Sequence, residues 1–389
     1  MTEILFVSHQ YPPSTGGMQR QSYELIKGME NHFKVHKHVH QKGSKIPFFF
    51  HLKRNVLNIL DQNPGIKIIH FNDGLMAAMA LPLAEACDLP FFVTLHGLDV
   101  VFNSQLYQNK YFPKIARRFK GIAVSEATQK ACIERGYLSE NISVALNGVG
   151  HEIAKTIKEK NFRTRLSEML GQDIENRKII LSVGRPVARK GFSFFAENIL
   201  PKLSDNVIYL MAGPGFNGVK KWNLANKLLP GNTVQLAISS LGIPTDGQRI
   251  LELERDHPNR IRYIKGLSWE DLKQLYQTAD LFVMPNLSVT GDMEGFGLVA
   301  LEAAMSETPV IASNIEGITS AIINNENGIL INEGDRVKWV ETIEFLLGNE
   351  AARLEFGRKG MEFTLDNYSW EKMVGEYVSI FRAEKKMAI

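Results

Sequence analysis

The chain has 389 residues, of which 44% are hydrophobic and 22% are charged, and its formal net charge is +3. This length is too great for one ordinary core and predicts two domains, and the composition is typical of a globular protein. The small charge gives no support for a nucleic-acid partner, and two cysteines (Cys87 and Cys132) favour a reducing compartment without a disulfide framework.

The first half of the chain alternates short apolar runs with amphipathic stretches. Helices are predicted over residues 18–29 and 75–87. The alternation indicates β-α-β units around a parallel sheet. Strands are predicted at residues 4–8, 33–39, 66–71, 91–95, 121–124 and 142–146.

The polar stretch at residues 150–177 predicts a linker that contains a helix. A second alternating series follows it. Ser268 and Asp271 form a capping box that predicts a helix start. Residues 216–259 are long for a connection and are expected to add one or two surface helices. Strands are predicted at residues 178–183, 207–212, 261–265, 281–284 and 310–312.

The predicted fold class is therefore α/β, with two doubly wound, Rossmann-like domains in tandem. We expect an N-terminal domain at residues 1–165, a second domain at 175–369, and a helix at 370–389 that packs back. Ligands in such sheets bind beyond the carboxyl ends of the strands, so a cleft between the facing domains is the expected active site.

The run EGFGLVALE, from Glu294 to Glu302, places two carboxylates eight positions apart around a Phe-Gly turn that opens a helix. Eight residues are about 2.2 helical turns, so Glu302 is expected roughly along the face below Glu294. The free N–H groups of Phe296, Gly297 and Leu298 can hold an anion at the helix start. This combination suits a nucleotide sugar, although a first-turn acid followed by a solvated acid would also give the pattern.

The loop GRPVARKG, from Gly184 to Gly191, follows a predicted strand and carries Arg185 and Lys190. Two fixed cations at this position can neutralise a pyrophosphate as it leaves. An ordinary basic surface loop is the alternative.

Two features in the first half are candidate site elements. His96 ends a predicted strand, where it could bond a sugar hydroxyl or offer its carbonyl oxygen, although a lone histidine is more often structural. Gly16 and Gly17 lie in the loop after the first strand, where they could let a ligand approach the backbone or simply form a turn.

The string GPGFNG at residues 213–218 matches the dinucleotide fingerprint, so a nicotinamide-dependent oxidoreductase is a rival hypothesis. No acid occurs from residue 206 to 245, so the ribose-binding carboxylate of that fingerprint is missing. Evidence for a metal is thin: His36, His38 and His40 alternate without a nearby carboxylate. We therefore expect neither a metal nor a cofactor.

The segment at residues 31–60 has no acid and contains Phe48, Phe49 and Phe50 among six lysines and arginines, and residues 100–125 are also basic and free of acids. Such segments can dock on anionic lipid, or can form an ordinary solvated face. The start MTEILFVSHQ lacks a basic leader and no window reaches the length of a membrane span, so the expectation is a cytoplasmic protein with peripheral contact at the inner face of the membrane.

Taken in order along the chain, these motifs resemble those of retaining glycosyltransferases of family 4, which have the GT-B fold. The resemblance covers the Gly16–Gly17 loop, His96, the stretch at 147–149, the basic loop (residues 184–191) and the two-glutamate run (residues 294–302). The last two are specific at this separation and in this order.

The resemblance implies roles for these residues. Glu294 would contact the donor-sugar hydroxyls, Glu302 would bind the ribose, and His96 would lie beside the transferred sugar. The diphosphate would be held by Arg185, Lys190 and the amides of Phe296, Gly297 and Leu298. Gly266 and Leu267 would border the base.

The expected activity is therefore metal-independent, retaining transfer of a hexose, from UDP-glucose or another UDP-hexose, to a glycan or lipid-linked acceptor. A GDP-mannose-dependent mannosyltransferase and a nucleotide-sugar epimerase on the same fold are the nearest alternatives. A non-catalytic nucleotide-sugar binding protein is a further one, against which the complete set of site residues argues.

Overall fold

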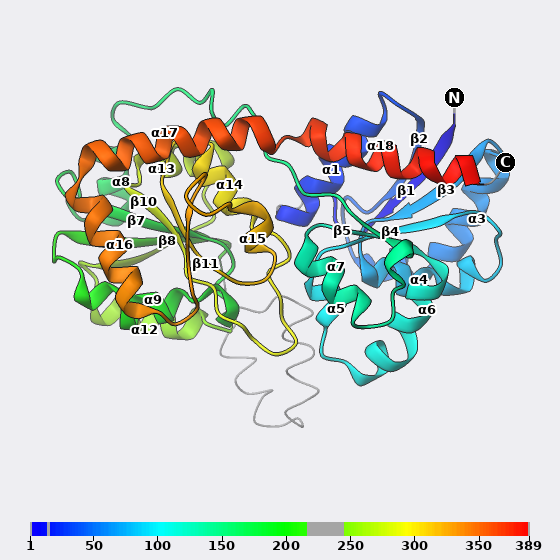
Figure 1. The fold of residues 1–389 in the computed structure, drawn as a ribbon, viewed down its shortest axis with the longest axis horizontal. Helices are drawn as coiled ribbons and strands as arrows, with labels where there is room; N and C mark the ends of the chain where they lie inside the picture. Colours follow the sequence, from blue (N-terminus) through cyan, green and yellow to red (C-terminus); the bar gives the residue numbers. More distant parts are fainter. Residues whose placement is uncertain (1, 14–15, 216–244, 388–389) are drawn as a thin grey trace. The chain divides into compact units, whose positions relative to one another are not determined.

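A computed structural model describes residues 2–13, 16–215 and 245–387, and the chain divides into two compact units (Figure 1). Unit 1 comprises Met1–Gly148 together with Tyr368–Ile389, and unit 2 comprises Val149–Asn367. Each unit contains one six-stranded sheet, so the predicted α/β class with two doubly wound sheets is confirmed.

The sheet of unit 1 is parallel in the order β2-β1-β3-β4-β5-β6. Its inner strands are buried along almost their whole length because helices cover both faces of a parallel sheet. The strands are β1 (Glu3–Ser8), β2 (Lys34–Val39), β3 (Ile66–Phe71), β4 (Phe91–Leu95), β5 (Lys120–Ala123) and β6 (Ile142–Val144).

The helices of unit 1 include the last one of the chain, α18, which packs on α1 (Figure 1). Inside this unit, the Thr94 hydroxyl lies 2.7 Å from the Tyr377 hydroxyl of α18 and 2.9 Å from His70 Nε2. The return of the C-terminal helix to the first domain, predicted from sequence, is therefore confirmed. The helices are α1 (Gly17–Met29), α2 (Lys45–Phe50), α3 (Leu52–Gln62), α4 (Gly74–Ala84), α5 (Leu98–Val101), α6 (Phe112–Arg118), α7 (Glu126–Ile133) and α18 (Trp370–Met387).

The sheet of unit 2 is also parallel, in the order β12-β11-β10-β7-β8-β9. Its strands are β7 (Lys178–Val183), β8 (Val207–Gly213), β9 (Ile261–Lys265), β10 (Leu281–Met284), β11 (Val310–Ser313) and β12 (Ile329–Ile331). Sequence analysis found the first five and missed β12, since three residues are too few to show a period of two.

The helices of unit 2 include α13, whose N-cap Ser268 accepts a hydrogen bond from the Asp271 N–H at 3.0 Å, as the capping box predicts. The helix at the C-terminal end of the predicted insertion is α12, and residues 216–244 lie outside the described residues. The helices are α8 (Phe162–Leu170), α9 (Phe192–Asn198), α12 (Gly247–Asp256), α13 (Trp269–Thr278), α14 (Leu298–Ala304), α15 (Ile318–Ala321), α16 (Arg336–Gly348) and α17 (Glu350–Asn367).

The boundary between the units falls at Gly148 and Val149, earlier than the predicted ends at 165 and 175. The predicted linker contains α8, which packs on α13 and is held there by an ion pair of 2.7 Å between Arg165 and Asp271. This segment is therefore part of unit 2. Gly148 is needed because a Cβ at this position would lie 2.3 Å from the main chain of Ser369, where the returning chain enters unit 1.

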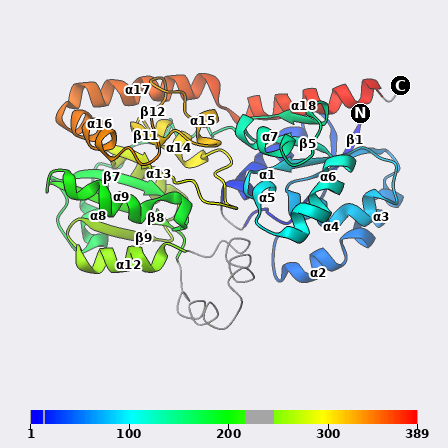
Figure 2. The same cartoon turned by 60° about the horizontal axis from the view of Figure 1, so that its bottom comes forward.

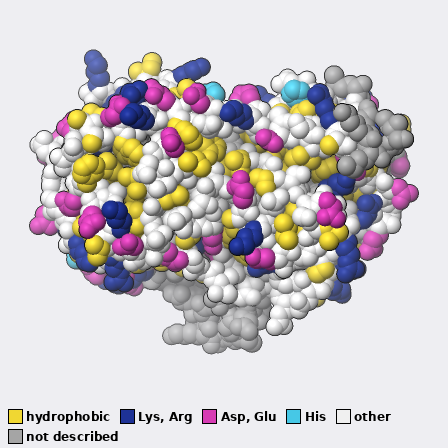
Figure 3. Space-filling view, viewed as in Figure 1, with side chains coloured by type: hydrophobic (Ala, Val, Ile, Leu, Met, Phe, Trp, Pro, Cys, Tyr) yellow, Lys and Arg dark blue, Asp and Glu magenta, His cyan; other side chains and the backbone are white. Residues whose placement is uncertain are grey.

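Acidic and basic side chains are interspersed over the visible surface of both units (Figure 3), in agreement with the small net charge. Within the described part of the chain, no helix combines the length and hydropathy needed to cross a bilayer.

Candidate functional site

The strand order of unit 2 reverses between β7 and β10, which lie side by side although they are far apart in sequence. The carboxyl ends of two such strands form the crevice where open α/β sheets bind ligands. The loops that follow these strands are tied together, because the Leu287 N–H donates to the Arg189 carbonyl oxygen at 2.8 Å. A Cβ on Gly191 would lie 1.9 Å from the Pro285 carbonyl oxygen, so only glycine permits this approach.

Glu294 is the centre of the site and is buried, with 9% of its surface exposed. One of its carboxylate oxygens lies 2.6 Å from Lys190 Nζ and accepts a hydrogen bond from Asn286 Nδ2 at 3.0 Å. Arg189 also pairs with this oxygen. Although burial alone would raise it, the charges of Arg189 and Lys190 hold the pKa of Glu294 at about 2. Glu294 is therefore a fixed anion, not a proton donor near neutral pH, and the alternative of a simple surface acid is wrong.

Arg189 was not identified from the sequence, although it lies in the loop that was. Its Nε donates to Asp292 at 3.0 Å while its terminal nitrogen pairs with Glu294, so it bridges two acids of the loop after β10. The sequence shows that Arg189 is one of the basic residues of this loop. Only the fold shows that its side chain is buried against Asp292 and Glu294.

Arg185, in contrast, is exposed, and its guanidinium makes no hydrogen bond or ion pair with any described residue. It follows Gly184, whose φ of 150° favours glycine and where a Cβ would lie 3.2 Å from Cε of Lys190. The basic loop therefore contributes two cations that are paired with acids and one that is available for an external anion.

The helix expected after the Phe-Gly turn is α14, which begins at Leu298 after Gly297 with φ 95°. Neither Gly297 nor Leu298 donates its N–H to another described residue, as an anion-binding helix start requires. Phe296 is buried beside them.

The count of about 2.2 helical turns between Glu294 and Glu302 does not apply, since the chain is not helical from Glu294 to Gly297 and α14 begins at Leu298. Glu302 is nevertheless buried, and its carboxylate accepts a hydrogen bond of 3.0 Å from the Tyr276 hydroxyl. Its predicted position inside the helix is confirmed, and the solvated alternative is not.

Gly266 and Leu267 follow β9 at the same carboxyl edge, where Gly266 has φ 63° and donates its N–H to the Gly213 carbonyl oxygen at 2.9 Å. In the sheet, β7 and β8 separate them from β10, so they lie to one side of the Glu294 cluster. The GPGFNG string ends outside the described residues, at 216–218.

In unit 1 the strand order reverses between β1 and β3, and an acid–base pair lies at that point. His9 Nδ1 is 3.0 Å from the carboxylate of Asp73, and both side chains are buried. Neither residue was singled out from the sequence, because they are brought together by the pairing of two separate strands. Gly16 and Gly17 form the start of α1 in the same unit.

His96 follows β4 and is fixed by its own unit. Its Nε2 lies 2.8 Å from the Asn72 carbonyl oxygen, which can only accept, so Nε2 is the donor of this hydrogen bond. Its main-chain N–H donates to Asp99 at 2.8 Å. These two hydrogen bonds fix the ring and the main chain of His96, while its expected place beside the sugar stays a prediction.

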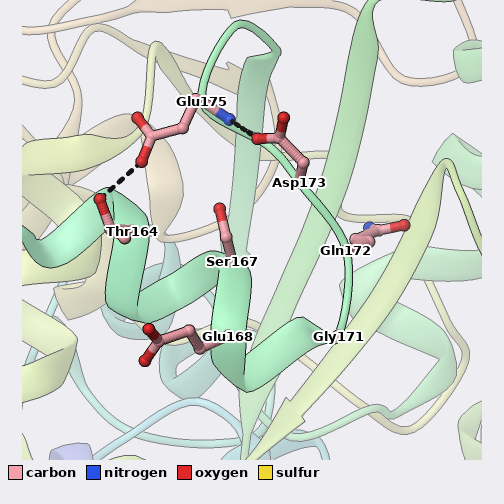
Figure 4. A pocket seen from close by; sticks show the side chains of 7 residues that line it. All are labelled: Thr164, Ser167, Glu168, Gly171, Gln172, Asp173 and Glu175. Atoms are coloured by element: carbon pink, nitrogen blue, oxygen red, sulfur yellow. Dashed lines mark hydrogen bonds between the residues drawn. The ribbon is translucent and has the colours of Figure 1, made fainter.

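A separate open pocket lies beside the C-terminal end of α8 (Figure 4). Glu168, Asp173 and Glu175 contribute carboxylates to its lining, and Glu175 accepts a hydrogen bond of 2.7 Å from Thr164. Because it precedes β7, it lies at the amino end of that strand, away from the ligand-binding edge. Its acidic lining is also unsuited to a diphosphate.

Comparison with known proteins gives a family match in each half of the chain. Residues 13–152 match the family described as Glycosyltransferase Family 4, and residues 245–363 match Glycosyl transferases group 1. A D-inositol 3-phosphate glycosyltransferase from Corynebacterium urealyticum is 25% identical over 81% of this chain and 71% of its own length. One from Salinispora tropica is 29% identical over 81% of this chain, which spans 63% of that protein.

Solved structures show the same fold over the whole chain. The Anabaena protein HepE, solved in complex with UDP, has a TM-score of 0.72 at 16% identity and covers 98% of this chain and all (100%) of its own. Sucrose-phosphate synthase from Thermosynechococcus elongatus has a TM-score of 0.73 at 18% identity, with 100% of both chains covered. The solved structures show the GT-B fold, and the two family matches together identify the chain as a family 4-like glycosyltransferase.

Proposed function

We propose that the chain transfers a hexose from a nucleoside diphosphate sugar, with UDP as the favoured nucleotide, to a hydroxyl group of a glycan or lipid-linked acceptor. The observation that carries this proposal is the charge cluster at the β7–β10 switch point, where the Arg185 side chain is free of partners among the described residues beside a buried, ionised Glu294. HepE, of the same fold, has been solved with UDP and with UDP-glucose, which supports the choice of nucleotide.

Within this cluster, Arg185 and the free N–H groups of Gly297 and Leu298 supply the positive potential that a diphosphate needs, without a metal ion. Asn286 Oδ1 is buried without a hydrogen-bond partner among the described residues. A sugar hydroxyl would satisfy this acceptor, while Glu294 would accept from another hydroxyl. Glu302, held by Tyr276, is assigned to the ribose.

The reaction that we propose retains the anomeric configuration. The bond from the anomeric carbon to the diphosphate oxygen breaks, and the acceptor oxygen bonds to that carbon on the same face. The acceptor proton passes to the departing diphosphate, whose new charge is stabilised by Arg185 and Lys190. His96 is the residue of unit 1 that we assign to the transferred sugar.

The donor is tested by thermal-shift titration with UDP, GDP, ADP and NAD(H), with and without magnesium. We expect UDP to raise the unfolding temperature without magnesium, since a ligand at a hundredfold excess over its dissociation constant stabilises by about 2.7 kcal/mol. A shift with GDP alone would indicate a GDP-mannose-dependent mannosyltransferase, and a shift with NAD(H) alone would contradict the proposal.

A turnover assay distinguishes a transferase from an epimerase and from a non-catalytic binding protein. Incubation of UDP-glucose with the protein should release UDP only when an acceptor is present. Products formed from the donor alone would indicate an epimerase, and binding without turnover on any glycan, lipid-linked sugar or D-inositol 3-phosphate would indicate a binding protein.

We also propose that unit 1 meets its acceptor at an anionic membrane, through α2 and the start of α3 (Figure 2). Phe48 and Phe49 hold α2 to the unit, because Phe48 stacks on His38 at 4.7 Å and Phe49 contacts His9 at 5.1 Å. Ile46 and Phe50, four residues apart, are left 76% and 82% exposed.

The charges around this apolar pair complement an anionic surface. Lys42, Lys53 and Arg54 are exposed, and no acid occurs between residues 31 and 60. An exposed apolar pair flanked by cations is the pattern of helices that lie in a membrane interface.

The double variant Ile46→Glu/Phe50→Glu is expected to lower vesicle binding at least tenfold, since it replaces two inserted side chains worth roughly 1.5–3 kcal/mol each when buried. Co-sedimentation with vesicles of equal parts phosphatidylglycerol and phosphatidylcholine measures this. The matched control is Val337→Glu/Phe345→Glu, which changes two similarly exposed apolar residues of unit 2 (64% and 62%). Equal binding of wild type to pure phosphatidylcholine, or an equal loss in the control, would contradict the assignment.

A further inference from the structure

Glu316 lies in the loop between β11 and α15 and contacts the main chain of Glu294. Its carboxylate accepts a hydrogen bond of 2.6 Å from the Glu294 N–H. The next residue, Gly317, donates its N–H to the Glu294 carbonyl oxygen at 3.1 Å. The main chain of Glu294 is thus held on both sides by one short segment of another loop.

The backbone of this segment is shaped for the contact. Glu316 has φ 48°, a left-handed conformation that glycine would adopt with less strain. At Gly317 a Cβ would lie 2.0 Å from the Gly295 carbonyl oxygen, so the two loops touch. Glutamate is strained at this φ relative to glycine, and the hydrogen bond from the Glu294 N–H to its carboxylate offsets that backbone cost.

The surroundings of Glu316 contain charges of both signs. Glu294 and Asp292 are the nearby acids and Arg189 is the nearby cation. Burial, together with the charge of Glu294, raises the pKa of Glu316 to about 7, against the opposing effect of its hydrogen bond and of Arg189. Glu294 itself stays ionised, so Glu316 is the carboxyl of the pair that titrates near neutral pH.

We propose that Glu316 is a positioning residue for sugar transfer, which fixes the main chain of Glu294 and thereby keeps its carboxylate between Lys190 and Asn286. The inference rests on the proposed donor-binding role of Glu294. An ionised acceptor makes the stronger hydrogen bond to an N–H, so proton uptake by Glu316 weakens the hold.

Activity and stability should therefore respond to pH in opposite directions. Transfer should increase as the pH rises through about 7, because Glu316 ionises. The contribution of Glu316 to stability has the other sign: its folded pKa is above the value of 4.5 for an unperturbed glutamate, so stability is gained as the pH falls from about 7 toward 4.5. A merely structural residue would not produce this opposition.

The kinetic test compares kcat and KM for the donor across this pH range in wild type, Glu316→Gly and Glu316→Gln. Glu316→Gly relieves the backbone strain but removes the acceptor, so we expect about tenfold lower kcat/KM, an unchanged or higher unfolding temperature, and no inflection near pH 7. Glu316→Gln keeps an amide oxygen for the Glu294 N–H, so it should recover much of the activity, again without the inflection.

Glu333→Gln is the matched control. Its carboxylate also accepts a main-chain N–H, that of Ser288 at 2.7 Å in the loop after β10, but it is exposed. This variant should retain the wild-type pH profile. Wild-type kinetics in Glu316→Gly, or an inflection that persists in Glu316→Gln, would overturn the inference.

A second measurement does not depend on transfer. Amide hydrogen exchange in the unliganded protein should be at least tenfold faster at Glu294 in Glu316→Gly than in wild type, and unchanged in Glu333→Gln. If wild type transfers no sugar, the proposed function fails while this measurement still decides whether Glu316 holds Glu294. Equal exchange in Glu316→Gly and wild type would refute that hold.

Discussion

Replacing Glu294 with glutamine is expected to lower kcat by about two to three orders of magnitude, the range observed when one charge-stabilising group is removed from an active site. The carboxylate is ionised and holds Lys190 at 2.6 Å, with Arg189 on the same oxygen. A neutral amide leaves Lys190 without its counter-charge and Arg189 paired with Asp292 alone, and it replaces one of the two acceptor oxygens by an NH₂ donor.

This variant also breaks a buried ion cluster, a change that costs about 3–5 kcal/mol when one partner is lost, so the measurement needs a folding control. Kinetics should be measured below the unfolding transition, with the transition of each variant recorded by circular dichroism. Glu341→Gln removes an exposed acid that pairs with Lys338 in the same unit and should leave both quantities unchanged. Near-normal turnover in folded Glu294→Gln would remove Glu294 from the donor site.

Arg185→Ala should lower kcat/KM for the donor by roughly 10- to 150-fold, which corresponds to one charge-assisted hydrogen bond of about 1.5–3 kcal/mol. Unlike Lys190 and Arg189, this guanidinium is exposed and has no partner among the described residues. Its loss therefore leaves no buried charge uncompensated, and the unfolding temperature should not fall.

Arg249→Ala is the control for this second variant, since Arg249 is an exposed arginine of unit 2 that pairs with Glu197 and Glu252 outside the proposed site. Both variants should be titrated with UDP as well as assayed. If Arg185→Ala binds UDP as tightly as wild type and turns over normally, the diphosphate does not lie on the β7 loop.

The three cations of the basic loop differ in their pairing with acids, and this difference explains why the two variants are expected to behave differently. Lys190 and Arg189 are already neutralised by acids of the neighbouring loop, so they hold Glu294 in place as well as adding potential. Of the three cations in this loop, Arg185 is the one whose side chain makes no ion pair or hydrogen bond with a described residue. Substitution of Lys190 or Arg189 is therefore expected to change both stability and activity. Substitution of Arg185 is expected to change ligand binding and activity only.

The sequence by itself determined the positions of eleven strands along the chain, the two-sheet class and the loops that carry the candidate site. Eleven predicted strands are present, and the basic loop and the two-glutamate run lie where their flanking elements imply. These features depend on hydrophobic periodicity and on turn residues, which act over a few neighbouring positions. The short β12 and the true domain boundary were missed, because the first has no measurable period and the second depends on the packing of α8 on α13.

The tertiary structure decided which charges meet. The placement of β10 beside β7 brings Glu294 to Lys190 and Arg189, and the placement of β1 beside β3 brings His9 to Asp73. Glu316 reaches Glu294 only because the loop after β11 folds over the start of the two-glutamate run. Pairing between buried charges depends on distances across strands that are remote in sequence, and no local pattern encodes those distances.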